Sequence, residues 1–461
     1  MLAGTGTIIG NTTMNSGGLL APAGSSLGTL SIVGNVAFNT GSTFSVQTSP
    51  DGSSDKLAVT GAVTITKGTN IQVLAGIAHY APTTSYVVLT ATGGISGKFA
   101  NVLTDYAYFK ATVNTQQKGT ITIQIAPNGK PLPSAASALA FSTASAVEAL
   151  GANSQLYQSV LYQSLTGARQ AFNALSGSGY GRLDAIMNQD LGSLTFASAA
   201  TNADAPSLAW TNTNALTARG AANGALRRRG AFSLFMVGGR YGTSLASNEV
   251  SGDVDTRFLA GAVAYHSGRF SGLAGITSAW HDAAITRTII YPGFAERSQA
   301  RYRSTTSRLE LEGDYDLAHG SGINATPYLG YAHLIIAAPA FSESGGFSAV
   351  AFGRENRAID QVRLGLRVAG RFEIGGLNLS PHVDASAQRF WGTGDPARTG
   401  RFVGGETSFD SGAQTFNRTE ASVDGGIDVA IGRATVSASY LIRRGDRWSD
   451  QTGRLTAALH F

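Results

Sequence analysis

The most regular pattern along the chain is an alternation of apolar and polar residues with a period of two, which begins near residue 231 and continues to the end. It is clearest in 303–317, 359–372 and 418–431, where Leu, Val and Ile alternate with Arg, Glu and Asp. These segments span about 10–14 residues, a length that suits strands tilted across a membrane. A soluble β-sandwich also alternates, but here short turns alternate with long loops, which is typical of outer-membrane barrels. We therefore predict an all-β region with an antiparallel transmembrane β-barrel over 231–461.

Eleven segments of this region resemble barrel strands, whereas a barrel built from one such chain needs an even number. One strand is therefore missing from the set, or one segment is a loop. The segments are 231–242, 254–266, 269–282, 303–317, 323–335, 359–372, 377–391, 401–410, 418–431, 433–443 and 450–461.

Shorter alternations fill residues 1–128, among them Thr29–Val33, Thr43–Val46 and Thr120–Ile125. Turn clusters such as Gly34-Asn35 separate them, and charged residues are few. Short strands repeated in this way predict the rungs of a right-handed β-helix, so we expect a stalk here.

The period changes in the linker 129–230, where apolar residues recur at helical spacing over 145–176. Ser145 and Glu148 have the spacing of a capping box. A helix of about 30 residues is roughly 45 Å long, enough to span a bilayer. Its other face carries Arg169 and several Asn and Gln residues, so we predict a helix inside a polar pore.

Composition narrows the class of protein. Charged residues make up 14% of the 461 residues, against about 25% in a typical soluble protein, and no run of about 18 apolar residues predicts a transmembrane helix. The absence of cysteine suits a chain that crosses an oxidising compartment unfolded. The net charge of +5 is spread out, so no nucleic-acid partner is expected. The first residues, 1–5, do not resemble a signal peptide, so an exported protein would extend beyond this sequence.

Charged residues on the strand faces opposite the apolar ones are predicted to line the barrel lumen. On the lipid face each would cost about 2–4 kcal/mol, whereas a wet lumen accepts both signs. They form a hydrophilic conduit or simply keep the wall polar, and the sequence leaves both roles open. These residues are Glu310, Glu312, Arg363, Arg367, Arg371, Glu420, Asp424 and Asp428.

No enzymatic chemistry is expected. The stretch Gly24–Gly28 fits G-x-S-x-G, but a strand follows it in place of the helix that a nucleophile elbow needs. The seven His residues are scattered without metal-ligand spacing, so no metal or cofactor is predicted. An integrin-type tripeptide at 444–446 is interpreted as a solvated loop.

Several short motifs occur in order along the chain. Two precede the barrel region at 18–30 and 51–57, and one at 86–99 follows the pattern Y.vl.a.gg..g.F. Thr326–Ala332 and Phe341–Gly346 match PY..laY and GftE.GG, and the chain ends in alternating apolar residues up to a terminal Phe. In this arrangement the chain resembles the C-terminal part of type Va autotransporters.

The resemblance implies a twelve-stranded barrel with a stalk from the end of the passenger β-helix and an autochaperone-like region. It implies a translocator of type V secretion that inserts in the bacterial outer membrane and delivers its own passenger, with the N-terminal region at the cell surface. It further implies a monomeric barrel whose partners are outer-membrane lipid, periplasmic chaperones and the barrel-assembly machinery. The assembly signal would be Leu455, Ala457, Leu459 and Phe461. The alternatives are a surface adhesin that binds through its stalk and a general porin.

Overall fold

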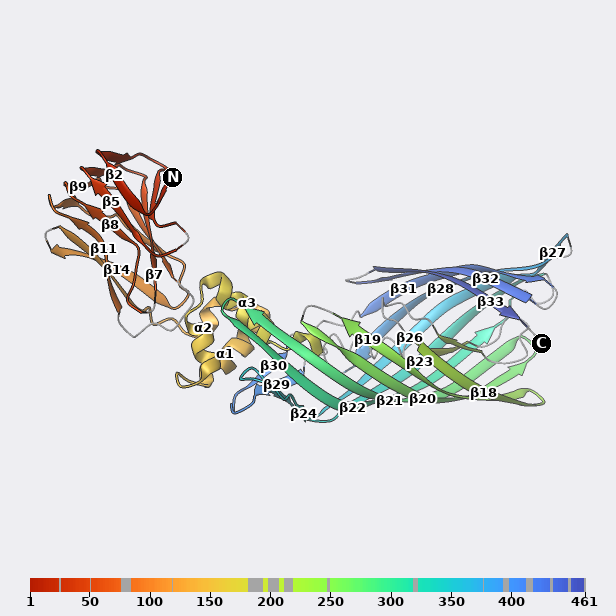
Figure 1. The fold of residues 1–461 in the computed structure, drawn as a ribbon. Coiled ribbons are helices and arrows are strands. Elements are labelled where there is room, and N and C mark those ends of the chain that lie inside the picture. Colours follow the sequence, from red (N-terminus) through yellow and green to blue (C-terminus); the bar gives the residue numbers. More distant parts are fainter. Residues whose placement is uncertain are drawn as a thin grey trace.

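The computed structural model describes residues 1–24, 26–49, 51–75, 84–117, 119–180, 194–197, 207–210, 219–246, 249–317, 322–375, 377–392, 398–411, 418–431, 434–446 and 449–459. They form, in chain order, a stalk of stacked strands, a group of short helices and a large curled sheet (Figure 1). The helices lie between the stalk and one end of the curled sheet. None of the described helices is long and apolar enough to cross a membrane.

Three parallel sheets run along the stalk, because each turn of the chain places its strands on those of the previous turn. The result is a solenoid, which confirms the stacked strands predicted for this region. In spatial order, the sheets contain β1 (Leu2–Gly4), β4 (Leu19–Pro22), β7 (Thr43–Thr48), β10 (Asn70–Ala75) and β13 (Asn101–Thr104); β2 (Gly6–Ile9), β5 (Thr29–Val33), β8 (Lys56–Val59) and β11 (Thr84–Ala91); and β12 (Ile95–Gly97), β9 (Val63–Ile65), β6 (Val36–Phe38) and β3 (Thr12–Met14).

Identical and similar side chains stack along the stalk. The rings of Phe38, Phe44 and Phe99 meet in its interior, with centroids 5.7–6.0 Å apart. On its surface the side-chain amide of Asn39 donates to Oδ1 of Asn15 at 2.9 Å. The stacking ends where β14 (Phe109–Gln117) and β15 (Thr120–Pro127) form an antiparallel hairpin and β15 pairs with β11.

The long helix predicted over 145–176 is wrong in its continuity. The region forms two 3₁₀ turns, η1 (Leu132–Ala135) and η2 (Ala138–Ala140), and three helices, α1 (Phe141–Ala149), α2 (Gln155–Leu161) and α3 (Leu165–Leu175). After α1, Gly151 adopts a φ of 76°, a conformation that stops a helix. The hydroxyls of Ser154 and Ser164 then cap α2 and α3 by accepting from backbone N–H groups.

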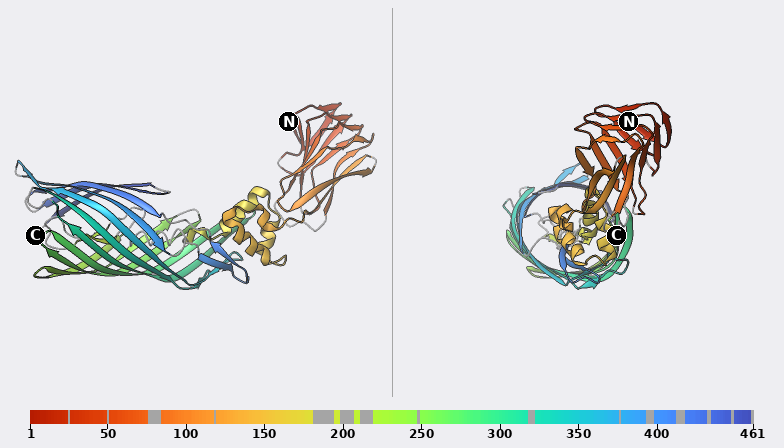
Figure 2. Two further views of the ribbon diagram at one scale, coloured as in Figure 1. Left: turned by 180° about the vertical axis from the view of Figure 1, so that it is seen from behind. Right: turned by 90° about the vertical axis from the view of Figure 1, so that its left-hand side faces the viewer.

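The predicted capping box is also wrong. Ser145 lies inside α1, where its hydroxyl donates to the Phe141 carbonyl at 3.0 Å. The Glu148 carboxylate instead accepts from the Leu132 N–H, which ties α1 to η1. Seen along the axis of the sheet, the helices lie within its outline (Figure 2), but they gather at one mouth and do not run along the strands (Figure 1).

The curled sheet contains twelve described strands, each antiparallel to its neighbours, and confirms the predicted fold class. Eleven of them lie side by side, and the short β27 pairs with β28 alone. They are β18 (Arg219–Arg229), β19 (Phe232–Ala246), β20 (Val250–Ser267), β21 (Phe270–Tyr291), β22 (Phe294–Tyr315), β23 (Ile323–Ala338), β26 (Glu355–Gly370), β27 (Phe372–Ile374), β28 (Leu377–Gly392), β31 (Thr419–Ile431), β32 (Ala434–Gly445) and β33 (Ser449–Leu459). A separate antiparallel pair is formed by β16 (Leu194–Ala197) and β17 (Ser207–Trp210).

Two predicted strand positions differ from the structure. The sheet begins with β18, ahead of the predicted start at 231. The prediction missed this strand because a segment rich in Gly and Ala shows no visible alternation of apolar and polar residues. The segment 401–410 is not part of the curled sheet. It contributes to a four-stranded sheet formed by β24 (Phe341–Ser342), β25 (Val350–Phe352), β29 (Arg398–Phe402) and β30 (Ser408–Ser411), which lies at the mouth beside the helices (Figure 1).

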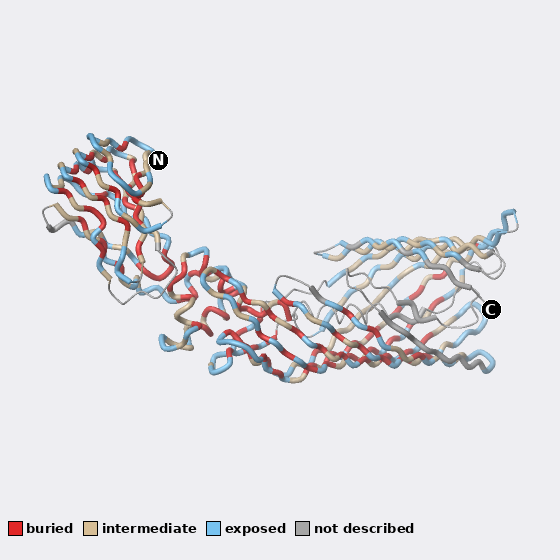
Figure 3. The backbone as a smooth tube through the Cα atoms, viewed as in Figure 1, coloured by how far each residue is buried: buried red, intermediate tan, exposed pale blue. Residues whose placement is uncertain are grey.

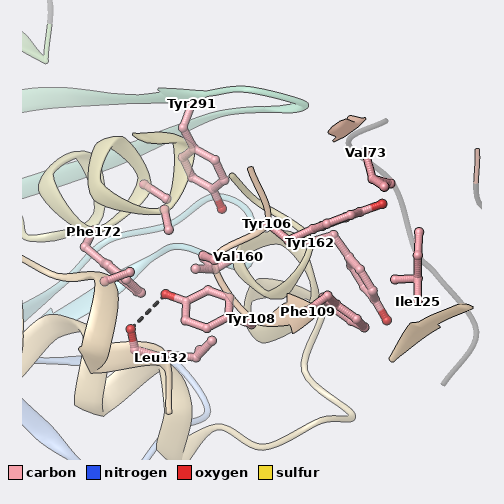
Figure 4. Close-up of a cluster of buried hydrophobic side chains, with 14 of the residues drawn as sticks. Val73, Tyr106, Tyr108, Phe109, Ile125, Leu132, Val160, Tyr162, Phe172 and Tyr291 are labelled. Atoms are coloured by element: carbon pink, nitrogen blue, oxygen red, sulfur yellow. Dashed lines mark hydrogen bonds between the residues drawn. The ribbon is translucent and has the colours of Figure 1, made fainter. Parts of the chain in front are cut away.

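One hydrophobic core joins the stalk, the helices and the mouth of the sheet. Its central part contains aromatic residues from all three (Figure 4). Phe109 of the stalk stacks on Tyr162 after α2 at 5.4 Å, and the Tyr108 hydroxyl donates to the Leu132 carbonyl. From the sheet, the Tyr291 hydroxyl lies 2.6 Å from that of Ser159 in α2. In Figure 3, where buried residues are red, the buried stretch continues from the stalk into the sheet.

A buried carboxylate holds two turns of the stalk together. Asp55 is 1% exposed and accepts from the N–H groups of Gly28 and Gln47 at 3.1 and 3.0 Å. Burial raises the pKa of this carboxyl, while the two N–H groups favour its charged form. Asp55 lies in the motif at 51–57, so its presence there has a structural reason.

We expect Asp55→Ala to destabilise the stalk by about 2–4 kcal/mol, because two buried N–H groups lose their acceptor. The measurement is the urea concentration at which protease cuts within 1–128 of the full chain in detergent. Asp51→Ala is the control, since Asp51 lies in an exposed turn. Equal shifts for the two variants would contradict this role of Asp55.

Candidate functional site

The wall of the curled sheet has two chemically different faces. Side chains alternate between exposed and buried positions along β21 and β22. The exposed face is apolar, although apolar residues on a soluble surface are usually scattered. It includes Phe232, Leu234, Met236, Leu259, Val263, Phe270, Ile276, Trp280, Leu309, Leu311, Leu329, Ile335, Leu364, Leu366, Val383, Trp391, Val423, Ile427, Val436, Tyr440, Ile442 and Leu455.

The apolar face has the height of a bilayer core. Phe270 and Trp280 on β21 are both exposed and lie about ten positions apart, which corresponds to about 33 Å along a strand. With a strand tilt of about 40°, the height becomes about 25 Å, the size of the apolar band of outer-membrane barrels. Beyond Trp280, the hairpin of β21 and β22 continues past this band to Tyr291 and Phe294.

On the opposite face, Arg and Glu side chains from separate strands meet. The Glu312 carboxylate of β22 accepts from Arg363 and Arg367 of β26, both at 2.8 Å. Glu310 lies 3.7 Å from Arg363 and 3.6 Å from Arg308. The two carboxylates are buried, at 4 and 5% exposure, so each depends on its arginines.

The arginines reach Glu312 across the intervening strand β23, which has Gly330 between them. A side chain at this position would begin 3.7 Å from both Arg363 and Glu312. These are ordinary van der Waals distances, so a methyl group would fit here beside the ion pair.

A tyrosine extends these ion pairs toward β28. Arg367 donates to Asp384 at 3.2 Å, and the Tyr328 hydroxyl donates to the same carboxylate at 2.9 Å. The Arg367 guanidinium lies 3.9 Å from the centre of the Tyr328 ring, a cation–π contact. The Tyr328 ring in turn covers Gly365, where any Cβ would come within 2.3 Å of it. We call Arg308, Glu310, Glu312, Arg363, Arg367 and Asp384 the lumen network.

The structure thus brings together four of the predicted lumen residues and separates the other four. Glu420, Asp424 and Asp428 lie half-buried on β31, on the face opposite Val423 and Ile427. The prediction for Arg371 is wrong, because β26 ends at Gly370 and Arg371 is exposed in the turn beyond it. Tyr328 and Asp384 were missed, although Tyr328 belongs to the quoted PY..laY motif.

At the mouth, a second charged site holds the helices. The Arg287 guanidinium donates to the Glu343 carboxylate through two bonds of 2.8 and 2.7 Å, to the Ser348 carbonyl and to the Ala174 carbonyl of α3. The Tyr180 hydroxyl also donates to Glu343, at 2.9 Å. Burial, followed by the nearby Glu343 charge, raises the pKa of Tyr180 and keeps it a donor. We call these residues the mouth clamp.

The mouth clamp was not predicted from the sequence, although Glu343 stands in the quoted GftE.GG motif. Its glycines have a structural reason, since Gly345 has a φ of 154° and a Cβ there would meet the Arg297 carbonyl at 2.6 Å. Arg287 was not predicted, because it lies between the predicted strands 269–282 and 303–317.

The remaining predicted residues lie apart from both sites. Arg169 is exposed on α3, so it does not face the lumen network. Leu455, Ala457 and Leu459 lie in β33, where Leu455 is exposed on the apolar face, and Phe461 lies outside the described residues.

The two short chemical motifs also have definite positions. Ser26 of the G-x-S-x-G stretch lies exposed between β4 and β5. The Asp446 carboxylate of the 444–446 tripeptide accepts from the N–H groups of Arg418 and Thr419, so it is used within the wall. In the described parts of the chain, no cluster of three or more His, Asp or Glu could hold a metal ion.

We expect Glu312→Gln to lower the free energy of unfolding of the sheet by about 3 kcal/mol, because the buried Glu312 carboxylate pairs with two half-buried arginines, which lose this counter-charge. The measurement is the urea dependence of the gel shift between folded and unfolded chain. Glu406→Gln removes the same charge from an exposed loop and should leave the midpoint unchanged. A midpoint unchanged by Glu312→Gln would show that the lumen network contributes no stability.

Comparison with known proteins shows which family this chain resembles. Residues 222–441 match the family described as autotransporter beta-domain. Two extracellular serine proteases of Serratia marcescens are each 25% identical to this chain, over 175 and 185 residues. These alignments cover 37 and 38% of this chain, and the chain spans only 17 and 18% of the length of these relatives.

Solved structures of similar fold include the translocator domain of the autotransporter NalP from Neisseria meningitidis, at 15% identity and a TM-score of 0.42, covering 53% of this chain and 82% of that one. The beta domain of the Bordetella autotransporter BrkA has 18% identity and a TM-score of 0.39, covering 52% of this chain and 89% of that one. Together with the two-faced wall, the family match shows that residues 222–441 are an autotransporter β-domain.

Proposed function

We propose that this chain carries its passenger through the curled sheet to the cell surface and then closes the sheet with its own helices. An autotransporter β-domain is a translocator of the outer membrane and has a passenger. The observation that carries the finer proposal is the arrangement of stalk, helices and sheet. The stalk is joined to the helices, and these are held at one mouth of a wall that is apolar outside and polar inside.

The lengths of the connections support the stalk lying outside the cell. At the end of the sheet away from the helices, tight turns at 230–231 and 268–269 join the strands. At the helix end, long connections cross from β23 to β26 and from β28 to β31, and they contain the mouth sheet. Outer-membrane barrels have short turns on the periplasmic side and long loops outside.

The contacts at the mouth suit a closed state that follows transport. Gln163 at the end of α2 donates to the Pro292 carbonyl at the tip of the long hairpin, and the mouth clamp holds the end of α3. The stalk is fixed to the same helices, since Leu165 and Asp105 share a backbone bond of 3.0 Å. Folding of the stalk outside would therefore make return of the chain unfavourable.

We assign transport to these residues, without a catalytic step or cofactor, because folding outside the membrane supplies the driving force. A porin would need an open mouth, and the helices at the mouth oppose that alternative. Periplasmic chaperones and the barrel-assembly machinery are the proposed partners of the unfolded chain, and the end of β33 is the segment that the machinery would read. One chain supplies the strands of the whole wall, so we propose a monomer.

Surface display tests this function directly. With a signal sequence added, the stalk should be cut by protease added to intact cells. The chain lacking Phe461 should fail to appear at the surface, yet refold normally in detergent, because burial of one Phe contributes only about 1.5–3 kcal/mol. Protection of the stalk in cells with a correctly assembled sheet would contradict the orientation. Normal display without Phe461 would exclude its role as an assembly signal.

Conductance tests closure of the mouth. Deleting 141–175 should raise the ion conductance of the chain in planar bilayers, and Glu343→Gln should raise the frequency of openings because it breaks the pair with Arg287. Glu406→Gln is the matched control, with the same loss of charge on the exposed surface. Equal conductance with and without 141–175 would show that these helices do not restrict the path.

A further inference from the structure

Above the apolar band, the outward face of the sheet becomes rich in arginine. Along β22 the outward positions include Arg297, Arg301 and Arg303, which are exposed and share one face because they are separated by even numbers of residues. Two strands away, about 10 Å across the sheet, β20 adds Arg257, and the next strand, β19, adds Arg240. We call these five residues the arginine belt.

The lower part of the belt, formed by Arg257 and Arg303, lies at the boundary of the apolar band. Arg257 pairs in register with Trp280, the exposed aromatic residue near the top of that band. Arg303 lies beside Asp282, two positions beyond Trp280. A molecule covering both regions must therefore have apolar chains directly attached to a charged head.

Carboxylates on the same face neutralise only part of this charge. Asp255 binds Arg240, and Asp282 accepts from Arg303 at 2.6 Å. Asp253 accepts from the Ser244 hydroxyl at 2.6 Å.

Three arginines of the belt remain available. Arg257 has only a longer-range interaction with Asp255. Thr288 separates Arg297, its register partner, from Glu249, whose carbonyl accepts from the Thr288 N–H. Among the described residues, neither Arg297 nor Arg301 forms an ion pair. The free charge on this face is therefore positive.

We propose that the arginine belt binds the phosphate groups of lipid A in the outer leaflet. Guanidinium groups form paired, charge-assisted bonds with phosphate, which makes arginine the preferred residue for this anion. Lipid A has phosphates directly above its acyl chains, so the chains would cover the apolar wall below Trp280 while the phosphates meet Arg257 and Arg301. This inference rests on the proposed function, because it needs the helix end of the sheet to face outward.

The test uses the full chain in detergent and native mass spectrometry. The lipids are lipid A, lipid A without phosphates and phosphatidylglycerol, each added over a range of concentrations. The triple variant Arg257→Gln, Arg297→Gln and Arg301→Gln is compared with Lys67→Gln, Lys98→Gln and Lys130→Gln. The second set removes the same charge from exposed positions outside the sheet.

We expect the unmodified chain and the lysine variant to bind lipid A more tightly than the other two lipids. The arginine variant should bind lipid A at least about tenfold more weakly, since several charge-assisted contacts are lost. Unchanged binding by the arginine variant would overturn the proposal. Equal binding of phosphate-free lipid A or of phosphatidylglycerol would overturn it as well.

The gel shift between heated and unheated chain shows separately whether each variant retains its folded sheet. Because the lipid is added to a purified chain, the result does not depend on transport. Failure of surface display with intact lipid A binding would count against the proposed function alone, whereas the converse result would count against the belt alone.

Discussion

Pairing of backbone groups is the constraint on which the rest of the structure depends. In hydrocarbon an unpaired N–H or C=O costs several kcal/mol, so a wall without helices must join each strand to its neighbours. Here consecutive strands of the sheet pair in antiparallel registers. Once the ladder is fixed, side chains must alternate between the two faces, and each residue faces either lipid or lumen. The apolar face from Phe270 to Trp280 and the lumen network are therefore two results of one constraint.

Charged side chains have different roles in the lumen network and in the mouth clamp. The lumen network balances three arginines with three carboxylates, so its burial leaves little net charge. Its neutrality suits a passage for chains of any sequence. The mouth clamp instead concentrates several donors on Glu343, and two of its contacts reach the segment that ends α3. It connects parts of the chain far apart in sequence, as a closing device requires.

The continuous core explains how the stalk can be positioned by the sheet. Phe109 and Tyr162 stack, Tyr291 reaches α2, and the hairpin that carries Tyr291 belongs to the same strands that contact lipid. The stalk is therefore connected to the wall through packed aromatic rings. The hairpin extends beyond the membrane band for this reason, since shorter strands would end before reaching the helices.

The sequence alone determined the features that depend on neighbours along the chain. Alternation predicted the two-faced wall, short strands with turns predicted the stacked stalk, and parity predicted that Glu312, Arg363 and Arg367 share a face. Contacts between distant segments were decided by the tertiary structure. Arg287 and Glu343 have no sequence pattern that relates them, since their pairing depends on the long hairpin lying beside the mouth sheet, where Gln299 bridges to Ser344. The helix breaks at Gly151 and Ser164 also escaped prediction, because helical spacing of apolar residues persists across a turn when successive helices bury the same core.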